Sequence, residues 1–394
     1  MFYKHSFTFL CPLIVLCSIF GICPSVFTRS ASVRKNNFLW YQIYCTILMT
    51  LSLGTTAYVL YKKDESTVPY AVHVADTFVH FALSVTTLCM FVSSVYSSKG
   101  FLLNRMFKKM DYVDDQLKYS IIYQKRRLFT GIFIYCFLII IYLIYDTFTW
   151  GSFLDGSQEY FFYNLPKNFQ ISQFSIGMLL PMSVLILNYL KIKGFNRALK
   201  NYSKLNYIQA AQSEANENNK NFFKQMCHVH TTIYEIVENF NKIFGTALLV
   251  GTLMGIGLVL HYIIILLVYF QFNGNWKGAT KYKYYVLAQC INGMLIPLLQ
   301  MLLLATIGDR VAFEASKSSN LCLALLNKFP AYSTYDWERE IIEELKTLML
   351  QCSFRNIVIT AKRFYSVNHT MLGFVITSLV TNIIVIMQFL GTNK

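Results

Sequence analysis

The sequence predicts an all-α integral membrane protein with seven transmembrane helices, on three observations. Hydrophobic residues make up 55% of the 394-residue chain and charged residues only 14%, whereas soluble domains carry about a quarter of charged residues. The mean hydropathy is +0.42. Seven long apolar stretches hold only two charged residues, both aspartates. This composition argues against a water-soluble enzyme, a disordered chain and a small disulfide scaffold.

Each of the seven apolar stretches is long enough to cross the hydrocarbon layer, which takes about 20 helical residues. The stretches are continuous and lack the alternation of polar and apolar residues that marks barrel strands. They are therefore predicted as helices. In chain order, the predicted spans are Phe38–Tyr61, Ala71–Ser97, Leu128–Trp150, Ile171–Leu190, Gly245–Phe272, Tyr285–Gly308 and Thr370–Leu390.

An eighth apolar stretch, Phe7–Phe27, is interrupted by Pro12 and Pro24. It is compatible with a signal peptide, with a true span, and with a segment that lies at the interface or re-enters. No clean cleavage site of small residues follows the stretch, which argues against a signal peptide. We favour an interfacial or partly buried segment.

Basic residues are distributed unequally between alternate loops. Of the 35 Lys and Arg residues, 28 fall in the N-terminal region and in the three long loops, and 7 fall in the other loops and the C-terminus. Because Lys and Arg concentrate on the cytoplasmic side of membrane proteins, the N-terminus is predicted to be cytoplasmic and the C-terminus extracellular. The net charge of +15 is thereby explained without a nucleic-acid partner. A G-protein-coupled receptor has the opposite orientation and is excluded.

The long inner loops carry amphipathic stripes with helical spacing. One lies in Asn221–Phe244 and runs into the fifth span, a second covers Leu103–Leu117, and a third covers Ile341–Cys352. Such stripes are typical of helices that lie on an anionic membrane surface, and also of spans that project into the cytoplasm as a packed bundle. We favour the bundle, because the stripes adjoin spans and need partners.

Residue patterns of common enzymes and metal sites are missing from the sequence. It contains no nucleophile elbow, zinc-protease helix motif, phosphate loop or dinucleotide loop. The ten cysteines lie in apolar segments or inner loops, where disulfides are not expected, and show no metal-ligand spacing. We therefore predict neither an enzyme nor a cofactor or metal.

Polar and aromatic residues gather in the outer halves of several spans. The aspartates Asp76 and Asp146 are the two intramembrane charges, and buried polar groups are costly unless they are satisfied. A polar, aromatic set at one depth predicts a water-accessible pocket for a small polar molecule, although anchoring at the membrane interface is the alternative. The candidate ligand-binding residues are Asp76, His80, Asp146, Trp150, Gln173, His261 and Tyr269.

The last span carries a polar stripe. Thr377, Thr381 and Gln388 share one side of the helix. Small polar groups in membrane helices often hold neighbouring helices together, but such a stripe followed by Phe389 also fits a pore lining with an apolar constriction. One helix cannot enclose a pore, so a channel would need several subunits.

Several segments carry a family resemblance. Thr381–Phe389 (TNIIVIMQF) resembles the last-helix signature of insect gustatory receptors, which is Thr-Tyr, five apolar residues and Gln-Phe, with Asn382 in place of the Tyr. Other segments also resemble the family, and their order is specific where each alone is weak. These segments are Pro12–Pro24, Ile233–Leu249, Gly308–Lys317 and Ile359–Leu372.

The resemblance implies a ligand-gated, non-selective cation channel, homotetrameric or mixed with related receptors, in the plasma membrane of a sensory neuron. A small-molecule tastant would bind in the outer halves of helices two to six, with membrane lipid around the protein. The seventh helix would line the pore. Its gate would be Gln388 and Phe389, with Thr381 and Ile384 or Val385 further along the pore.

The resemblance also implies a division of the chain. Inner helical extensions would form an anchor domain, giving an N-terminal segment (1–37), helices one to six (38–308), cytoplasmic anchor helices (309–369) and the pore helix with its tail (370–394). Two other functions stay open: a seven-helix receptor that signals through a cytosolic partner, and an obligate co-receptor. The ligand class, whether sugar, bitter compound, carbon dioxide or nutrient, is also open.

Overall fold

The structure is a computed structural model that is almost entirely helical. The first of its helices, α1, covers Ser6–Ile19. The structure describes residues 6–23, 31–62, 70–95, 99–117, 122–153, 158–203, 213–271, 279–329 and 336–392.

Seven helices are long and apolar enough to cross a membrane, and each of them overlaps one of the seven predicted spans. The prediction of a seven-span, all-α membrane protein is therefore confirmed. These helices are α2 (Ala31–Lys62), α3 (Tyr70–Val95), α5 (Ile122–Phe153), α6 (Gln158–Tyr202), α8 (Ser213–Gln271), α9 (Ala279–Leu326) and α11 (His369–Thr392).

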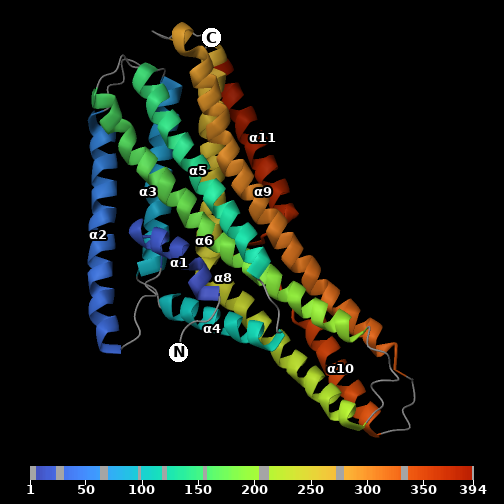
Figure 1. Ribbon diagram of the computed structural model, residues 1–394. Coiled ribbons are helices and arrows are strands. Elements are labelled where there is room, and N and C mark those ends of the chain that lie inside the picture. The colour runs from blue at the N-terminus through green and yellow to red at the C-terminus, as the bar shows by residue number, and fades with distance from the viewer. Residues whose placement is uncertain are drawn as a thin grey trace.

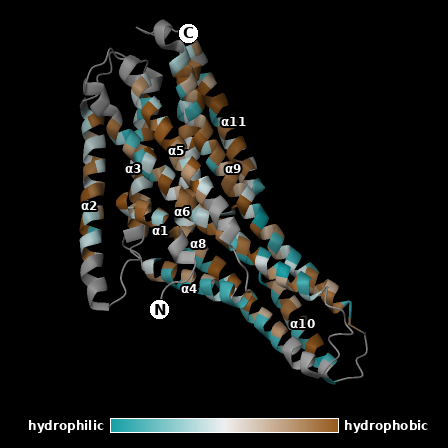
Figure 2. Ribbon diagram, in the orientation of Figure 1, coloured by the Kyte–Doolittle hydropathy of each residue, from teal (hydrophilic) through white to brown (hydrophobic). Residues whose placement is uncertain are grey.

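Three of these helices are much longer than a membrane is thick. The helices α6, α8 and α9 contain 45, 59 and 48 residues. At 1.5 Å per residue, α8 is about 88 Å long, roughly three times the hydrocarbon thickness. Their ends converge with α10 (Asp336–Phe354) in the narrow part of the molecule, opposite the C-terminal end of α11 (Figure 1). Apolar residues dominate the broad part and polar residues the narrow part (Figure 2).

The amphipathic stripes predicted in the long loops are buried against other helices. In α4 (Lys99–Leu117), Leu103, Met106 and Met110 are buried, and in α10 the same holds for Leu345 and Leu348. All five belong to one continuous core with residues of α6, α8 and α9. The predicted helical bundle is therefore present, and its stripes face neighbouring helices.

A buried ion pair joins α4 to α6. The ammonium of Lys191 contacts the carboxylate of Asp114, and the two side chains are 1% and 8% exposed. If either residue of a buried ion pair is lost, the other charge stays buried without compensation, which is strongly destabilising. The pair therefore fixes the position of α4 on the long helix.

The short helix α1 packs against α6 and α4. Leu13, Ile14 and Cys17 are buried, whereas Val15 is exposed. Its 14 residues are too few to cross a membrane. This agrees with the favoured interpretation of Phe7–Phe27 as a partly buried segment over residues 7–23, and residues 24–27 lie outside the described part of the chain.

A small β-hairpin connects α10 to α11, and the sequence did not predict it. Strands β1 (Thr360–Ala361) and β2 (Tyr365–Ser366) pair antiparallel. The side chain of Asn241 in α8 holds this connection: its amide donates to the Val358 carbonyl at 2.9 Å, and its oxygen accepts from the Thr360 amide at 3.0 Å. The hairpin thus fixes the point at which α11 begins.

Candidate ligand pocket and exposed terminal helix

Two groups of polar side chains lie within the span bundle, and the first contains an aspartate between two histidines. Asp76 Oδ2 lies 3.7 Å from Nε2 of His80, one turn further along α3. Asp76 Oδ1 lies 3.8 Å from Nε2 of His261 in α8. The side chains of both histidines are 3% exposed and that of Asp76 is 20% exposed. The structure therefore brings together three of the predicted residues and links α3 to α8 through them.

The second group is centred on Asp146, which is fully buried in α5. Nε2 of Gln289 in α9 donates to Asp146 Oδ1 at 2.5 Å. Asp146 Oδ2 is buried without a hydrogen-bond partner among the described residues. A buried carboxylate oxygen without a donor is costly, so this atom is suited to accept a hydrogen bond from a ligand or a water molecule.

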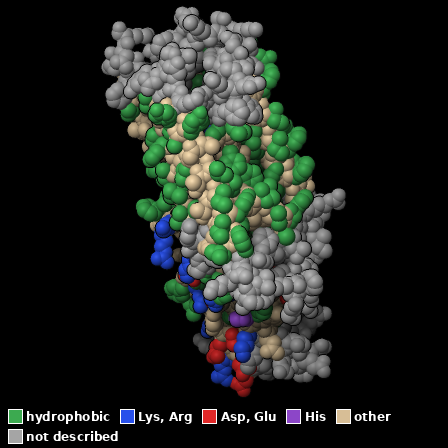
Figure 3. All heavy atoms as spheres, turned by 90° about the vertical axis from the view of Figure 1, so that its left-hand side faces the viewer, with side chains coloured by type: hydrophobic (Ala, Val, Ile, Leu, Met, Phe, Trp, Pro, Cys, Tyr) green, Lys and Arg blue, Asp and Glu red, His purple; other side chains and the backbone are tan. Residues whose placement is uncertain are grey.

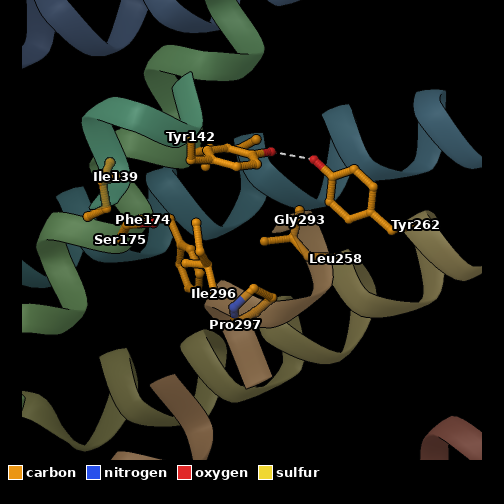
Figure 4. Close-up of a pocket in the computed structure, with 10 residues that line it drawn as sticks. Ile139, Tyr142, Phe174, Ser175, Leu258, Tyr262, Gly293, Ile296 and Pro297 are labelled. Atoms are coloured by element: carbon orange, nitrogen blue, oxygen red, sulfur yellow. Dashed lines mark hydrogen bonds between the residues drawn. The ribbon is translucent and has the colours of Figure 1, made fainter. Parts of the chain in front are cut away.

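A small pocket lies next to the second group, between α5, α6, α8 and α9. On α5, Tyr142 is one turn from Asp146, and on α9, Gly293 is one turn from Gln289, so the polar pair lies at one end of the pocket. The space between the lining atoms totals about 340 Å³ including its open side. The lining residues are Ile139, Tyr142, Ile171, Phe174, Ser175, Leu258, Tyr262, Gly293, Ile296 and Pro297 (Figure 4).

Two tyrosines define the polar edge of this pocket. The hydroxyl groups of Tyr142 and Tyr262 are hydrogen-bonded to each other (Figure 4). The ring of Tyr262 lies over Gly293, where a Cβ atom would come within 2.3 Å of it. Glycine is therefore required at position 293 for the tyrosine to reach its partner. Most of the remaining lining is aliphatic or aromatic, as in typical small-molecule sites.

The two polar groups meet at neighbouring residues of α8. His261 faces α3 and pairs with Asp76, whereas Tyr262 faces α5 and bonds Tyr142. Their rings are in edge contact, with centroids 5.1 Å apart. The residues predicted to form a single pocket thus lie in two adjoining polar groups, and the group near Asp146 lies one helical turn from the pocket.

The other predicted ligand residues have different surroundings. Gln173 donates to the carbonyl of Phe20 at 3.0 Å and so fastens α6 to the end of α1. Tyr269 is buried in a small apolar cluster with Val286 and Cys290. Trp150 lies in α5, but its side chain is outside the described residues.

Sequence reasoning missed most of the residues that line the pocket. Phe174, Ile296 and Pro297 are ordinary residues of an apolar span and carry no signal that separates a pocket wall from a lipid contact. Tyr142 could have been found, because it precedes Asp146 by one helical turn. Gln289 could have been found in the same way, as a buried amide in an otherwise apolar stretch.

A second small cavity lies between α6, α8 and α9, with about 210 Å³ of space when its open side is included. Both cavities are lined by Pro297. The second one reaches Met301 in α9 and Thr252 in α8. The hydroxyl of Thr252 contacts the sulfur of Met371 in α11 at 3.9 Å. A chain of contacts therefore runs from the pocket to the first turn of the last helix.

The last helix is the most exposed of the seven spans. Only 11% of its most apolar 18-residue stretch is buried. The side chains of Thr381, Ile384, Val385 and Gln388 are all exposed. Phe389 lies in α11, but its side chain is outside the described residues. The helix thus presents both its apolar and its polar residues outwards.

Among the described residues, no group of three or more His, Cys, Asp or Glu side chains is arranged to hold a metal ion. All ten cysteines are free thiols.

Comparison with known proteins gives two kinds of match. The model of the 7tm chemosensory receptor family matches residues 10–390. The insect olfactory receptor OR5 from Machilis hrabei has a similar fold, with a TM-score of 0.64 and 14% identity, over 98% of this chain and 99% of that chain. The same receptor in complex with eugenol has a TM-score of 0.59 and 13% identity at the same coverage. No curated protein matches the sequence.

Proposed function

Because the chain belongs to the 7tm chemosensory receptor family, we propose that it is a gustatory receptor of an insect, working as a tetrameric, ligand-gated, non-selective cation channel opened by a small tastant. It is a multi-pass membrane protein and not an enzyme. Its proposed place is the plasma membrane of a sensory neuron, with the N-terminus in the cytoplasm, as the distribution of basic residues suggests.

The exposed last helix is the observation that carries the channel proposal. A helix with a polar stripe that is 11% buried in a single chain gains partners when several copies surround one axis. Four copies of α11 would enclose a pore with Thr381 and Gln388 on its wall. Gln388 and Phe389 would form the gate near the outer end, and Ile384 or Val385 would line the pore further in.

The pocket favours a small, mostly apolar ligand with one or two hydrogen-bond donors. Its wall is largely aliphatic and aromatic, and its polar edge is the pair Tyr142 and Tyr262 with Asp146 beyond. A sugar needs polar partners around its whole rim, which this lining does not offer. If the lining side chains move apart to admit it, a phenol or an aromatic amine could extend past Tyr142 and Tyr262 to donate to Asp146 Oδ2, with its ring against the apolar lining. The related olfactory receptor has been solved with eugenol, a ligand of this kind.

Gating then requires the ligand to bind the open form more tightly than the closed form. A difference of about 1.4 kcal/mol in binding free energy changes the ratio of open to closed tenfold. One hydrogen bond to a buried charged group contributes about 1.5–3 kcal/mol. The second cavity and the contact between Thr252 and Met371 offer a route by which this difference could reach α11.

The direct test is to express the chain alone in cultured cells and to record whole-cell current while small phenols, aromatic amines and sugars are applied. Phenols or amines should evoke a cation current at lower concentration than sugars do. Asp146→Asn should raise the half-maximal concentration about tenfold or more, because the substitution removes the charge that accepts the ligand's hydrogen bond. Asp115→Asn, at an exposed carboxylate of α4, is the matched control and should leave the concentration unchanged.

Substitutions in the last helix test the pore separately. Gln388→Ala and Phe389→Ala should change conductance or ion selectivity without altering delivery to the cell surface. Ligand-evoked currents that are identical to wild type in both variants would exclude the gate assignment. Identical dose–response curves for Asp146→Asn would exclude the pocket assignment.

Two alternatives make different predictions. A receptor that signals through a cytosolic partner would give no direct current, and an N-terminal epitope tag outside the cell would favour it. An obligate co-receptor would be silent alone and would pass current only with related chains.

A further inference from the structure

The turn of the β-hairpin before α11 has an unusual backbone. The Phe364 amide donates to the Ala361 carbonyl at 3.0 Å, which makes residues 361–364 a four-residue turn. Its two central residues, Lys362 and Arg363, have φ angles of 49° and 65°. Positive φ at both central positions defines a type I′ turn, which normally takes Asn-Gly. Lysine and arginine are both unfavourable in this conformation, so the backbone of the turn is strained.

The strained turn is held firmly in place by glycines on two helices. A Cβ atom at Gly245 in α8 would lie 2.8 Å from the Lys362 amide nitrogen. A Cβ atom at Gly308 in α9 would lie 1.9 Å from the Val367 carbonyl oxygen. The hairpin backbone therefore lies directly against both helices, and the two cations are presented from a rigid base.

A third cation lies beside the turn. Partial burial and the charge of Lys362 lower the pKa of Lys99 to about 8. The packing of α4 agrees with this proximity, because α4 runs antiparallel to α8 and its register carries Lys99 towards Gly245. The contacts that set the register are Gln116 with Gln225, Tyr112 with His228 and Lys109 with Glu235.

The cations of the turn have no acidic partner among the described residues. Lys362 and Arg363 are both exposed, and neither makes an ion pair with a described carboxylate. Lys362 lies near enough to Lys99 for the two charges to repel, and Arg363 follows Lys362 directly in the turn, so an anion bound beside these cations would be favoured.

The turn lies where the apolar spans end. The span of α11 begins at His369, three residues after β2. Phe364, directly after the two cations, is 79% exposed, which suits the boundary between lipid and water better than bulk water. On the face shown in Figure 3, basic side chains gather immediately below the belt of apolar side chains. This setting favours a lipid headgroup over a free anion.

We propose that Lys362 and Arg363 of the hairpin turn, together with Lys99, bind the phosphorylated headgroup of an anionic membrane lipid at the foot of α11. The headgroup phosphate would lie among the three cations, and Phe364 would insert beside the acyl chains. The strained backbone is retained because Asn-Gly, although better suited to the turn, would remove two of the three charges.

The test uses the purified full chain in detergent and native mass spectrometry of bound lipid. Dioctanoyl phosphatidylinositol bisphosphate should bind at least tenfold more tightly than dioctanoyl phosphatidylcholine. The double variant Lys362→Asn with Arg363→Gly should weaken binding of the anionic lipid about 25-fold, since each cation near a lipid surface contributes about a fivefold effect. Because Asn-Gly fits a type I′ turn, the melting temperature of this variant should not fall.

The control removes two exposed lysines elsewhere, Lys317→Gln with Lys346→Gln, and should leave lipid binding unchanged. Lys99→Gln should weaken binding about fivefold and provides a second variant. Equal binding by wild type and the turn variant would overturn the proposal. Equal affinity for free inositol phosphate and for the lipid would also overturn it, because the site would then recognise a soluble anion.

Discussion

The helices α6 and α11 are both apolar spans, yet they are buried to opposite degrees. The most apolar 18-residue stretch of α6 has a mean hydropathy of 1.6 and is 83% buried. The corresponding stretch of α11 has a mean hydropathy of 2.1 and is 11% buried. Hydropathy therefore identifies both as spans but does not tell which one forms the centre of the chain. The difference lies in where their polar side chains point.

In α6, polar side chains bond other helices of the same chain. The amide of Gln170 lies within 3.2 Å of hydroxyls in both α2 and α3, and the amide of Asn196 donates to the Glu314 carbonyl at 2.7 Å. In α11, Asn382 instead donates to the Ser378 carbonyl of its own helix, and Thr381 is exposed. The polar groups of α6 thus specify the fold of one chain, and those of α11 suit an assembly of several.

The largest expected effect is at the buried pair between α6 and α4. Lys191→Ala should lower the free energy of unfolding by about 3–5 kcal/mol, because it leaves the buried Asp114 carboxylate without its counter-charge. Thermal unfolding in detergent measures the change. Lys193→Ala, at a half-buried lysine two residues further along α6, is the control and should cost much less.

A paired substitution sharpens this prediction. Lys191→Met with Asp114→Leu should recover most of the lost stability, since an apolar pair can replace a buried ion pair. Equal melting temperatures for Lys191→Ala and Lys193→Ala would contradict the assigned role of the pair.

A second comparison uses glycines that lie in different surroundings. A Cβ at Gly308 would come within 1.9 Å of the Val367 carbonyl, whereas a Cβ at Gly373 in α11 would meet nothing within 4 Å. Gly308→Ala should therefore destabilise the chain by about 1–3 kcal/mol through overpacking. Gly373→Ala should be neutral or stabilise by up to about 1 kcal/mol through helix propensity. Thermal unfolding of both variants checks the contrast, and a loss of stability at Gly373 would show that its side of α11 is packed.

Much of the fold follows from local sequence patterns, as particular elements illustrate. Continuous apolar runs predict the spans, and the stripe of Leu103, Met106 and Met110 predicts both the helix α4 and its buried face. The hairpin before α11 escaped prediction, because strands of two residues leave no periodic pattern and its turn carries Lys-Arg instead of Asn-Gly.

The candidate site was less accessible to sequence reasoning than the fold. The residues Asp76, His80 and His261 do come together, as the sequence predicted. Titratable residues are rare in apolar spans, which makes them easy to identify, and they usually pair with one another inside the membrane. The pocket wall does not stand out, since Phe174 and Ile296 look like any lipid-facing residues. Gln173 was selected for its polarity, yet its bond to the Phe20 carbonyl serves the attachment of α1.

The smallest expected effect on stability separates the two helices most directly, through the same substitution in each. Gln170→Leu in α6 should lower the free energy of unfolding by about 1–2 kcal/mol, because the substitution removes the amide that lies within hydrogen-bond distance of hydroxyls in both α2 and α3. Gln388→Leu in α11 should leave the unfolding of the detergent-solubilised single chain unchanged within about 0.5 kcal/mol, since its side chain is exposed. The same variant should alter ligand-evoked conductance in cells, where four copies would bring position 388 to the pore. A Gln388→Leu variant that unfolds as early as Gln170→Leu would mean that the polar stripe of α11 stabilises a single chain and not an assembly.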